Sequence, residues 1–278
     1  MSALITVAVL IVVYLLAQES MRRRHLRFML ALFGLLPLAL TSYWIHTNEL
    51  DLFLWIKIYS VMFCICWGSW LRFTEHGKNP WFLRTIPWLL AANILEATTM
   101  DFLNKGWAHG LNALSGALLI VSMPHGASRI RIDHACRYCD LRFNVSFPWI
   151  IGYTLWNWTF VYLNYSSISG HHTAVLVAAL IVAIGDPQRW LQVRAATLGL
   201  SLLLTATNYS GMLAVIDTTS WYDANIEMAA ALIVFSWMIV HLWLKLADNT
   251  RFAADRLPKH LHRYVPQACR SFSLRAGR

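Results

Sequence analysis

The chain has 278 residues, of which 58% are hydrophobic and only 13% are charged, and its formal net charge is +9. Soluble domains carry about a quarter charged residues, so this composition argues against a soluble protein and favours lipid as the main solvent. Fourteen Trp and ten Tyr fit the enrichment of aromatic side chains at the two membrane interfaces. A basic chain often binds nucleic acid, but the distribution of the charge argues against that partner.

Apolar runs recur along the chain and are long enough to cross a hydrocarbon core of about 30 Å. They predict an all-α fold, a polytopic transmembrane helix bundle of about nine helices. The first and seventh runs are short, so eight helices are an alternative. We expect one transmembrane helical domain over 1–246 and a basic cytoplasmic tail over 247–278. The nine predicted helices cover residues 3–18, 28–45, 52–71, 87–104, 107–123, 148–165, 171–185, 195–214 and 225–246.

Positive charge alternates between the connections. Basic groups follow the first, third, fifth, seventh and ninth segments, the seventh being followed by Arg189 and Arg194, and they hold all but two of the 23 Lys and Arg. The positive-inside rule then predicts an outside N-terminus and a cytoplasmic C-terminus. Because no Lys or Arg precedes the first apolar run, we expect a retained helix and not a signal peptide. The Arg bias favours a multi-pass protein of the cell membrane, most simply a bacterial inner membrane.

The basic tail has two interpretations. It can bind anionic lipid headgroups, at about 1 kcal/mol per charge near the surface, or it can merely fix the topology. Pro258 interrupts any continuous helix there, which favours the second interpretation.

The fourth predicted helix carries an acid in its apolar run. Glu96 lies nine residues past Pro87, or roughly 13 Å along a helix, which is the bilayer midplane. An ionised carboxylate there costs about 2.5–3.5 kcal/mol on insertion scales, so Glu96 must face protein or water. Asn93 lies one turn earlier on the same face and can donate its amide to the carboxylate. The alternative to a functional site is a neutral Glu that hydrogen-bonds to another helix.

The sixth predicted helix offers a partner at the same depth. Asn157 lies nine residues past Pro148, and this helix runs in the same direction as the fourth. We therefore expect Asn157 beside Glu96. Trp158 and Tyr162 are four residues apart next to Asn157, and they can wall a cavity or stack on a cation.

Further polar residues lie in the predicted outer halves of the bundle. Asp101 closes the fourth helix, His109 opens the fifth, and Asn208 lies late in the eighth. Together they predict a polar funnel that descends from outside toward Glu96. Small polar residues also serve to pack helices together, which is the alternative for each of them alone.

The cytoplasmic segment 124–147 gathers four soft or borderline metal ligands, His125, His134, Cys136 and Cys139. Such a set can close a tetrahedral zinc site. A single CxxC pair is a weak signal, however, and an inert loop is favoured over zinc or a redox dithiol. No other cofactor is predicted, and no Gly-rich phosphate loop for a Walker-type ATPase is present.

Three functions fit these residues. The leading hypothesis is a secondary transporter or channel for a small cation or a proton-coupled solute, with Glu96 as the ion or proton site and Asn93 and Asn157 as its tuning donors. The alternative is a membrane-embedded enzyme acting on a lipid or isoprenoid, with Glu96 as general acid and Trp158 and Tyr162 sheltering positive charge. The third is a non-catalytic membrane assembly factor.

Overall fold

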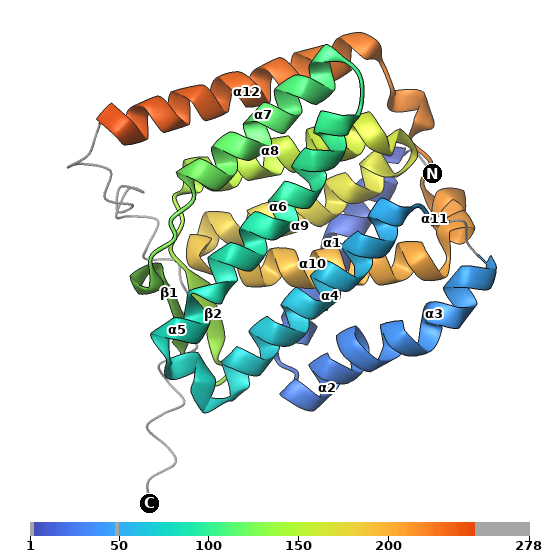
Figure 1. The fold of residues 1–278 in the computed structure, drawn as a ribbon. Coiled ribbons are helices and arrows are strands. Elements are labelled where there is room, and N and C mark those ends of the chain that lie inside the picture. Colours follow the sequence, from blue (N-terminus) through green and yellow to red (C-terminus); the bar gives the residue numbers. More distant parts are fainter. Residues whose placement is uncertain (1–2, 48–49, 248–278) are drawn as a thin grey trace, which may run out of the picture.

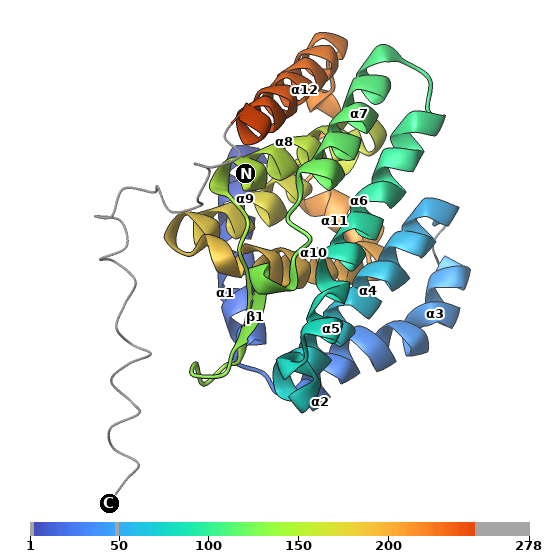
Figure 2. The same ribbon diagram turned by 60° about the vertical axis from the view of Figure 1, so that its left-hand side comes forward.

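The computed structural model describes residues 3–47 and 50–247, and it shows a bundle of helices with one small β-hairpin (Figures 1 and 2). The long helices are α1 (Ala3–Arg22), α4 (Leu52–Phe73), α6 (Thr85–Leu103), α7 (Trp107–Ser122), α8 (Phe147–Asn164), α9 (Ser169–Gly185), α10 (Trp190–Thr207) and α12 (Ala224–Ala247).

Shorter elements complete the chain. The segments α2 (Leu26–Leu30), a π-helical turn η1 (Ala31–Leu35) and α3 (Leu36–Thr47) follow one another without a break. Single helical turns are α5 (Pro80–Leu83) and the 3-10 turns η2 (Glu75–Lys78), η3 (Ala127–Arg129), η4 (Ser166–Ile168), η5 (Pro187–Arg189) and η6 (Thr219–Trp221). The helix α11 (Tyr209–Val215) is also short, and β1 (Ile130–Asp133) pairs antiparallel with β2 (Asp140–Phe143), Ile130 opposite Phe143.

Each of the nine predicted segments overlaps a helix of the structure. Over residues 3–47 and 50–247, five helical stretches are long and apolar enough to cross a membrane, or six if the bent pair α10–α11 is one span. This pattern is compatible with a membrane protein. The helices α6, α7 and α8 are not among the five, because α7 is short and α6 and α8 carry polar side chains in their interiors. Nine crossings and the orientation therefore stay predictions.

The eighth predicted segment is wrong as one continuous helix. The chain bends by 108° between α10 and α11. Asn208 lies at the break with a non-helical backbone, and its side-chain oxygen accepts a hydrogen bond from the amide of Gly211 at 3.0 Å. Such a side-chain cap starts a new helix, which explains why apolar composition alone did not reveal the break.

The helices form layers (Figures 1 and 2). Helix α12 lies along one edge of the bundle, against α7 and α8, and the α2–α3 run lies near the opposite edge. Between them α6 packs on α7 and α4, and α9 packs on α8, α10 and α1. The hairpin lies at one end of the bundle, called the hairpin end below, and α11 lies at the other (Figure 1).

Helix α7 packs closely between α6 and α8 at Gly116. A Cβ atom at this position would overlap the hydroxyl of Thr98 and lie 2.9 Å from Nε1 of Trp156. Replacing Gly116 by Ala is therefore expected to destabilise the fold by about 1–3 kcal/mol, since a well-packed interface must open. Gly110→Ala is the matched control in the same helix, because nothing lies within 4 Å of its added Cβ. Thermal unfolding in detergent checks this; equal midpoints for the two variants would contradict the packing.

At the hairpin end, a buried carboxylate ties four segments together. Asp140 of β2 is 0% exposed and accepts hydrogen bonds from Nη2 of Arg22 at 2.7 Å and from Nε2 of Gln192 at 3.2 Å. Arg189 lies 4.0 Å from the same carboxylate. Arg72 of α4 donates to the carbonyl oxygen of Tyr138 at 2.8 Å. Basic residues that follow the first, third and seventh predicted segments thus meet at one end of the bundle.

This carboxylate should make stability depend on pH. Burial alone would raise the pKa of Asp140, but the hydrogen bond and charge of Arg22, with Arg189 and Gln192, lower it to about 2. A folded-state pKa below the unfolded value of about 3.9 contributes stability, roughly 2 kcal/mol, that is present above that value and lost as the pH falls through about 2. The midpoint difference between the unsubstituted protein and Asp140→Asn should therefore narrow from about pH 5 to pH 2; a constant difference would contradict this.

Candidate functional site

Glu96 lies near the middle of the 19-residue helix α6 and forms an ion pair with a residue of α4. The distance from Nζ of Lys57 to its carboxylate is 2.9 Å, and the hydroxyl of Ser60 donates to the same oxygen at 3.0 Å. Lys57 also donates to the backbone carbonyl of Asn93 at 2.9 Å. The two charged side chains are 10% and 21% exposed, so the pair is largely enclosed.

This pairing differs from the predicted site in two respects. The residue that contacts Glu96 across helices is Lys57 of α4 and not Asn157 of α8. Asn93 offers its carbonyl oxygen to Lys57, and its predicted amide bond to Glu96 is not present in the described structure. A charged group in a low-dielectric layer requires an opposite charge more than a neutral amide, which explains the choice of partner.

Asn157 instead belongs to a second polar group, which contains a buried arginine. Its side-chain oxygen accepts hydrogen bonds from Nε2 of His172 at 2.6 Å and from Nη2 of Arg194 at 2.8 Å. The neighbouring His171 contacts the hydroxyl of Tyr14 in α1 at 2.7 Å. Asn157 therefore joins α8 to α9 and α10 at the place where the prediction expected it to meet α6.

The placement of Arg194 corrects the sequence analysis. It was counted with Arg189 as a basic residue in a connection. The structure places it inside α10, which begins at Trp190, and it is only 2% exposed. The eighth predicted segment begins at residue 195, because Arg194 interrupts the apolar run. It therefore starts five residues after α10 does.

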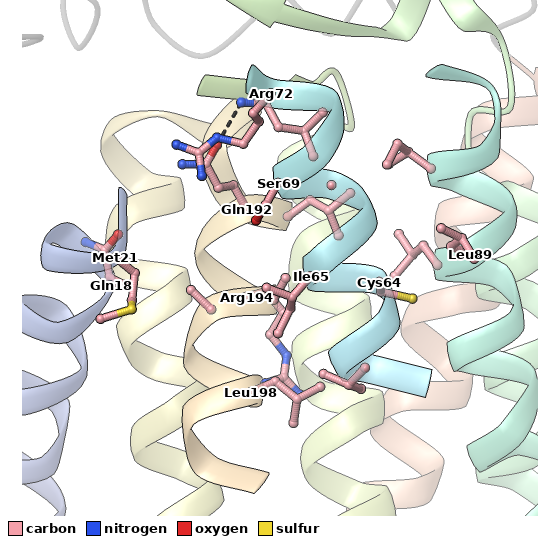
Figure 3. A pocket seen from close by; sticks show the side chains of 18 of the residues that line it. Gln18, Met21, Cys64, Ile65, Ser69, Arg72, Leu89, Gln192, Arg194 and Leu198 are labelled. Carbon is pink, nitrogen blue, oxygen red and sulfur yellow. Dashed lines mark hydrogen bonds between the residues drawn. The ribbon is translucent and has the colours of Figure 1, made fainter. Parts of the chain in front are cut away.

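Two cavities meet at Arg194. The larger has a volume of about 110 Å³ and the smaller about 60 Å³, and Asn93, Arg194 and Leu198 line both. Figure 3 shows Arg72 and Gln192 at one end of the larger cavity and Arg194 beside Leu198 toward the other. Several polar side chains line the smaller cavity. Its polar lining includes Lys57, Asn157, His171, His172, Arg194 and Ser201.

The predicted outer vestibule residues contact each other. Asp101 is 0% exposed and accepts hydrogen bonds from Nδ1 of His109 at 3.0 Å, from Asn112 at 2.6 Å and from Asn164 at 2.8 Å. These bonds join the ends of α6, α7 and α8 that lie away from the hairpin. Neither Asp101 nor His109 lines the two cavities, so their contacts are those of a cross-link between helices.

The predicted aromatic pair also has structural partners. The rings of Trp158 and Tyr162 stack at 4.9 Å, and neither ring lines the two cavities. Trp158 donates to the hydroxyl of Thr173 at 2.9 Å, and the hydroxyl of Tyr162 donates to the carbonyl of Trp221 at 2.7 Å. Asn208 caps α11, as described above, and does not line either cavity.

The four predicted zinc ligands lie in and near the hairpin. His125 hydrogen-bonds through Nδ1 to the carbonyl of Met123 at 2.7 Å, and Cys136 lies 3.6 Å from Asp140. His134, Cys136 and Cys139 lie at the turn between the two strands. Over the part of the chain that the structure describes, no three His, Cys, Asp or Glu side chains form a group that could hold a metal ion.

Comparison with known proteins gives one match. Residues 1–250 match the model of DUF5692, a family of unknown function. The chain belongs to the DUF5692 family. No curated protein and no solved structure matches it. The matched range of this DUF5692 chain includes both cavities and the Lys57–Glu96 pair.

The sequence did not assign Lys57, His172 or Arg194 to this centre. Lys57 was visible as a lone Lys inside a predicted helix, which is a signal of an intramembrane partner. His172 stands at the very start of the seventh predicted segment, residues 171–185, where an interfacial position is expected. The structure starts α9 at Ser169 and buries His172 to 7% exposure.

Proposed function

We propose that this chain is a multi-pass membrane carrier that couples movement of a small solute to protonation of Glu96, with the inner membrane of a bacterium as its location. The observation that carries the proposal is the enclosed Lys57–Glu96 pair, which joins α4 to α6 beside the smaller cavity. Ionisable pairs within membrane helices mark ion and proton pathways more often than they mark simple packing.

The pair supplies a switch. While Glu96 is ionised, its negative charge balances the positive charge of Lys57, and the ammonium group is held between the carboxylate and the carbonyl of Asn93. When Glu96 takes up a proton, Lys57 loses its counterion, and its ammonium lines the smaller cavity as an uncompensated charge. A solute that interacts differently with these two states shifts the equilibrium between them, which is the requirement for coupling.

The charge at the cavity favours a proton-coupled solute over a transported cation. Lys57 and Arg194 both line the smaller cavity, and Glu96 does not. A transported cation placed there would be repelled by both side chains in a low-dielectric surrounding. The funnel predicted from Asp101 and His109 provides no opposing acid at this cavity, since Asp101 is bonded to three side-chain donors elsewhere.

A lipid-modifying enzyme is the second candidate, and the apolar wall of the larger cavity favours it. Glu96, Trp158 and Tyr162 do not line that cavity. The general acid and the aromatic side chains that this enzyme requires would therefore not touch a substrate bound there. Turnover of extracted lipid by the protein in detergent, without a sealed compartment, would support this candidate. An assembly factor predicts a co-purifying partner and no response in either assay.

The carrier is tested in sealed vesicles that contain only this protein and a pH-sensitive dye. Sodium pyruvate added outside should acidify the interior in a protein-dependent way. Sodium chloride at the same concentration, which controls for sodium and for ionic strength, should not. Glu96→Gln should reduce the signal by about tenfold or more, because its side chain cannot bind and release the proton. Glu75→Gln is the control, since Glu75 forms a surface pair with Lys78 and should transport normally. Normal coupling in Glu96→Gln would contradict the proposal.

A further inference from the structure

In the part of the chain that the structure describes, Arg194 is a buried cation without an anionic partner. Arg194 is only 2% exposed. Over residues 3–47 and 50–247, its Nη2 atom contacts only neutral groups, those of Asn157 at 2.8 Å and His172 at 3.4 Å. Its Nε and Nη1 atoms are buried and have no hydrogen-bond partner among the described residues. A guanidinium has five N–H donors and cannot lose its charge, so three of them point at no acceptor.

Nearby charges do not compensate Arg194. Lys57 lines the same cavity, and its charge is already matched by Glu96. The group formed by Arg194, Lys57 and Glu96 therefore keeps one positive charge within the helix layer. A buried charge of this kind is strongly unfavourable unless an opposite charge joins it.

The surrounding space suits the missing anion. A single water needs about 10–15 Å³ of cavity volume. The smaller cavity of about 60 Å³ therefore holds the equivalent of roughly four to six waters. This is room for a carboxylate and too little for a phospholipid headgroup. On the other side of Arg194, the larger cavity has apolar walls that can accept a short hydrocarbon chain. These walls include Met29, Val61, Ile65, Leu90, Ala195 and Leu198.

We propose that Arg194 binds the carboxylate of a short-chain organic acid, with the acid's hydrocarbon chain lying along the larger cavity. Asn157 positions the guanidinium, because its side-chain oxygen accepts a hydrogen bond from Nη2 and leaves the other two nitrogens free. His172 donates to the same oxygen of Asn157 and lies 3.4 Å from Nη2. The binding site stands on this geometry alone. That the bound acid is the solute that moves with the proton rests on the proposed function.

Binding is tested in detergent at pH 7 by isothermal titration and by thermal shift, with butyrate as the probe. Butyramide, which has the same size and no charge, is the control ligand, and sodium chloride at equal ionic strength is the control for salt. We expect saturable stabilisation by butyrate alone. Equal shifts with butyramide or chloride would overturn the assignment of a carboxylate, and a response to decanoate without one to butyrate would overturn the assignment of size. The comparison of ligands needs no variant.

Two variants locate the site. Arg194→Met should weaken butyrate binding by about tenfold or more while the ligand-free protein unfolds at the same or a higher temperature, since an uncompensated charge is removed. A lower midpoint with unchanged butyrate affinity would overturn the proposal in favour of a structural arginine. Arg131→Gln is the control, because Arg131 is exposed and lies on the hairpin. If butyrate bound but pyruvate caused no protein-dependent acidification of the vesicles, the carrier would be contradicted and the binding site would stand.

Discussion

Replacing Lys57 by Met is expected to destabilise the protein by about 3 kcal/mol, whereas the double variant Lys57→Met with Glu96→Gln should recover most of that loss. The single variant leaves a largely enclosed carboxylate that keeps only the hydroxyl of Ser60 as a partner. Breaking one half of an enclosed ion pair is costly, but removing both charges together is often neutral. Thermal and denaturant unfolding of the purified protein in detergent measure both variants.

The surface pair of Glu75 and Lys78 is the matched control, with an N–O distance of 2.6 Å and both side chains more than half exposed. Removing that lysine should produce no measurable change, because water already solvates the carboxylate. If Lys57→Met and the double variant unfolded at the same temperature, the two charges would not be coupled, and the switch described for this centre would have no basis.

Replacing Asp101 by Ala is expected to cost about 3–5 kcal/mol, comparable to the loss of a buried charged partner. Its carboxylate is fully buried and accepts from three side chains on α7 and α8, all within 3.0 Å. Without it, the buried donors of Asn112 and Asn164 lose an acceptor, and the ends of α6, α7 and α8 lose their common link. Unfolding in detergent measures the effect.

Asp101→Asn is the informative companion. An amide keeps one acceptor oxygen but presents a donor group to three donors, so an intermediate loss is expected. Vesicle acidification by both variants, per folded molecule, should remain close to that of the unsubstituted protein, because Asp101 lines neither cavity. Loss of coupling with unchanged stability would instead support the vestibule role that the sequence suggested.

The helices could be predicted from the sequence better than their contacts. Apolar length located nine helical segments, because lipid-facing and core-facing residues are both apolar. The end of α10 was not predicted, since Asn208 acts through a local side-chain cap between two apolar stretches that were joined into one segment. Similarly, the start of α10 was obscured by Arg194, a residue type that favours connections in membrane chains.

Within the site, the sequence did not predict which side chains become partners. Glu96 and Asn157 were expected at matching heights, and both lie within the helix layer, but their rotation about each helix axis decides which neighbour they meet. Glu96 faces Lys57, and Asn157 faces Arg194. That rotation depends on packing of side chains such as Thr98 around Gly116, which a single sequence does not encode visibly. The pair Asp101–His109 was easier, because a short turn joins their helices.

If the acid that Arg194 binds is the solute that moves with the proton, then anion binding at Arg194 and protonation of Glu96 are linked. Proton uptake on butyrate binding measures that link. Titration of butyrate in two buffers of different ionisation enthalpy gives the number of protons bound per ligand. We expect the unsubstituted protein to take up at most about one proton, because a bound anion supplies Lys57 and Arg194 with negative charge that Glu96 otherwise provides, whereas Glu96→Gln should take up none. Butyrate binding with no proton uptake by the unsubstituted protein would contradict the link.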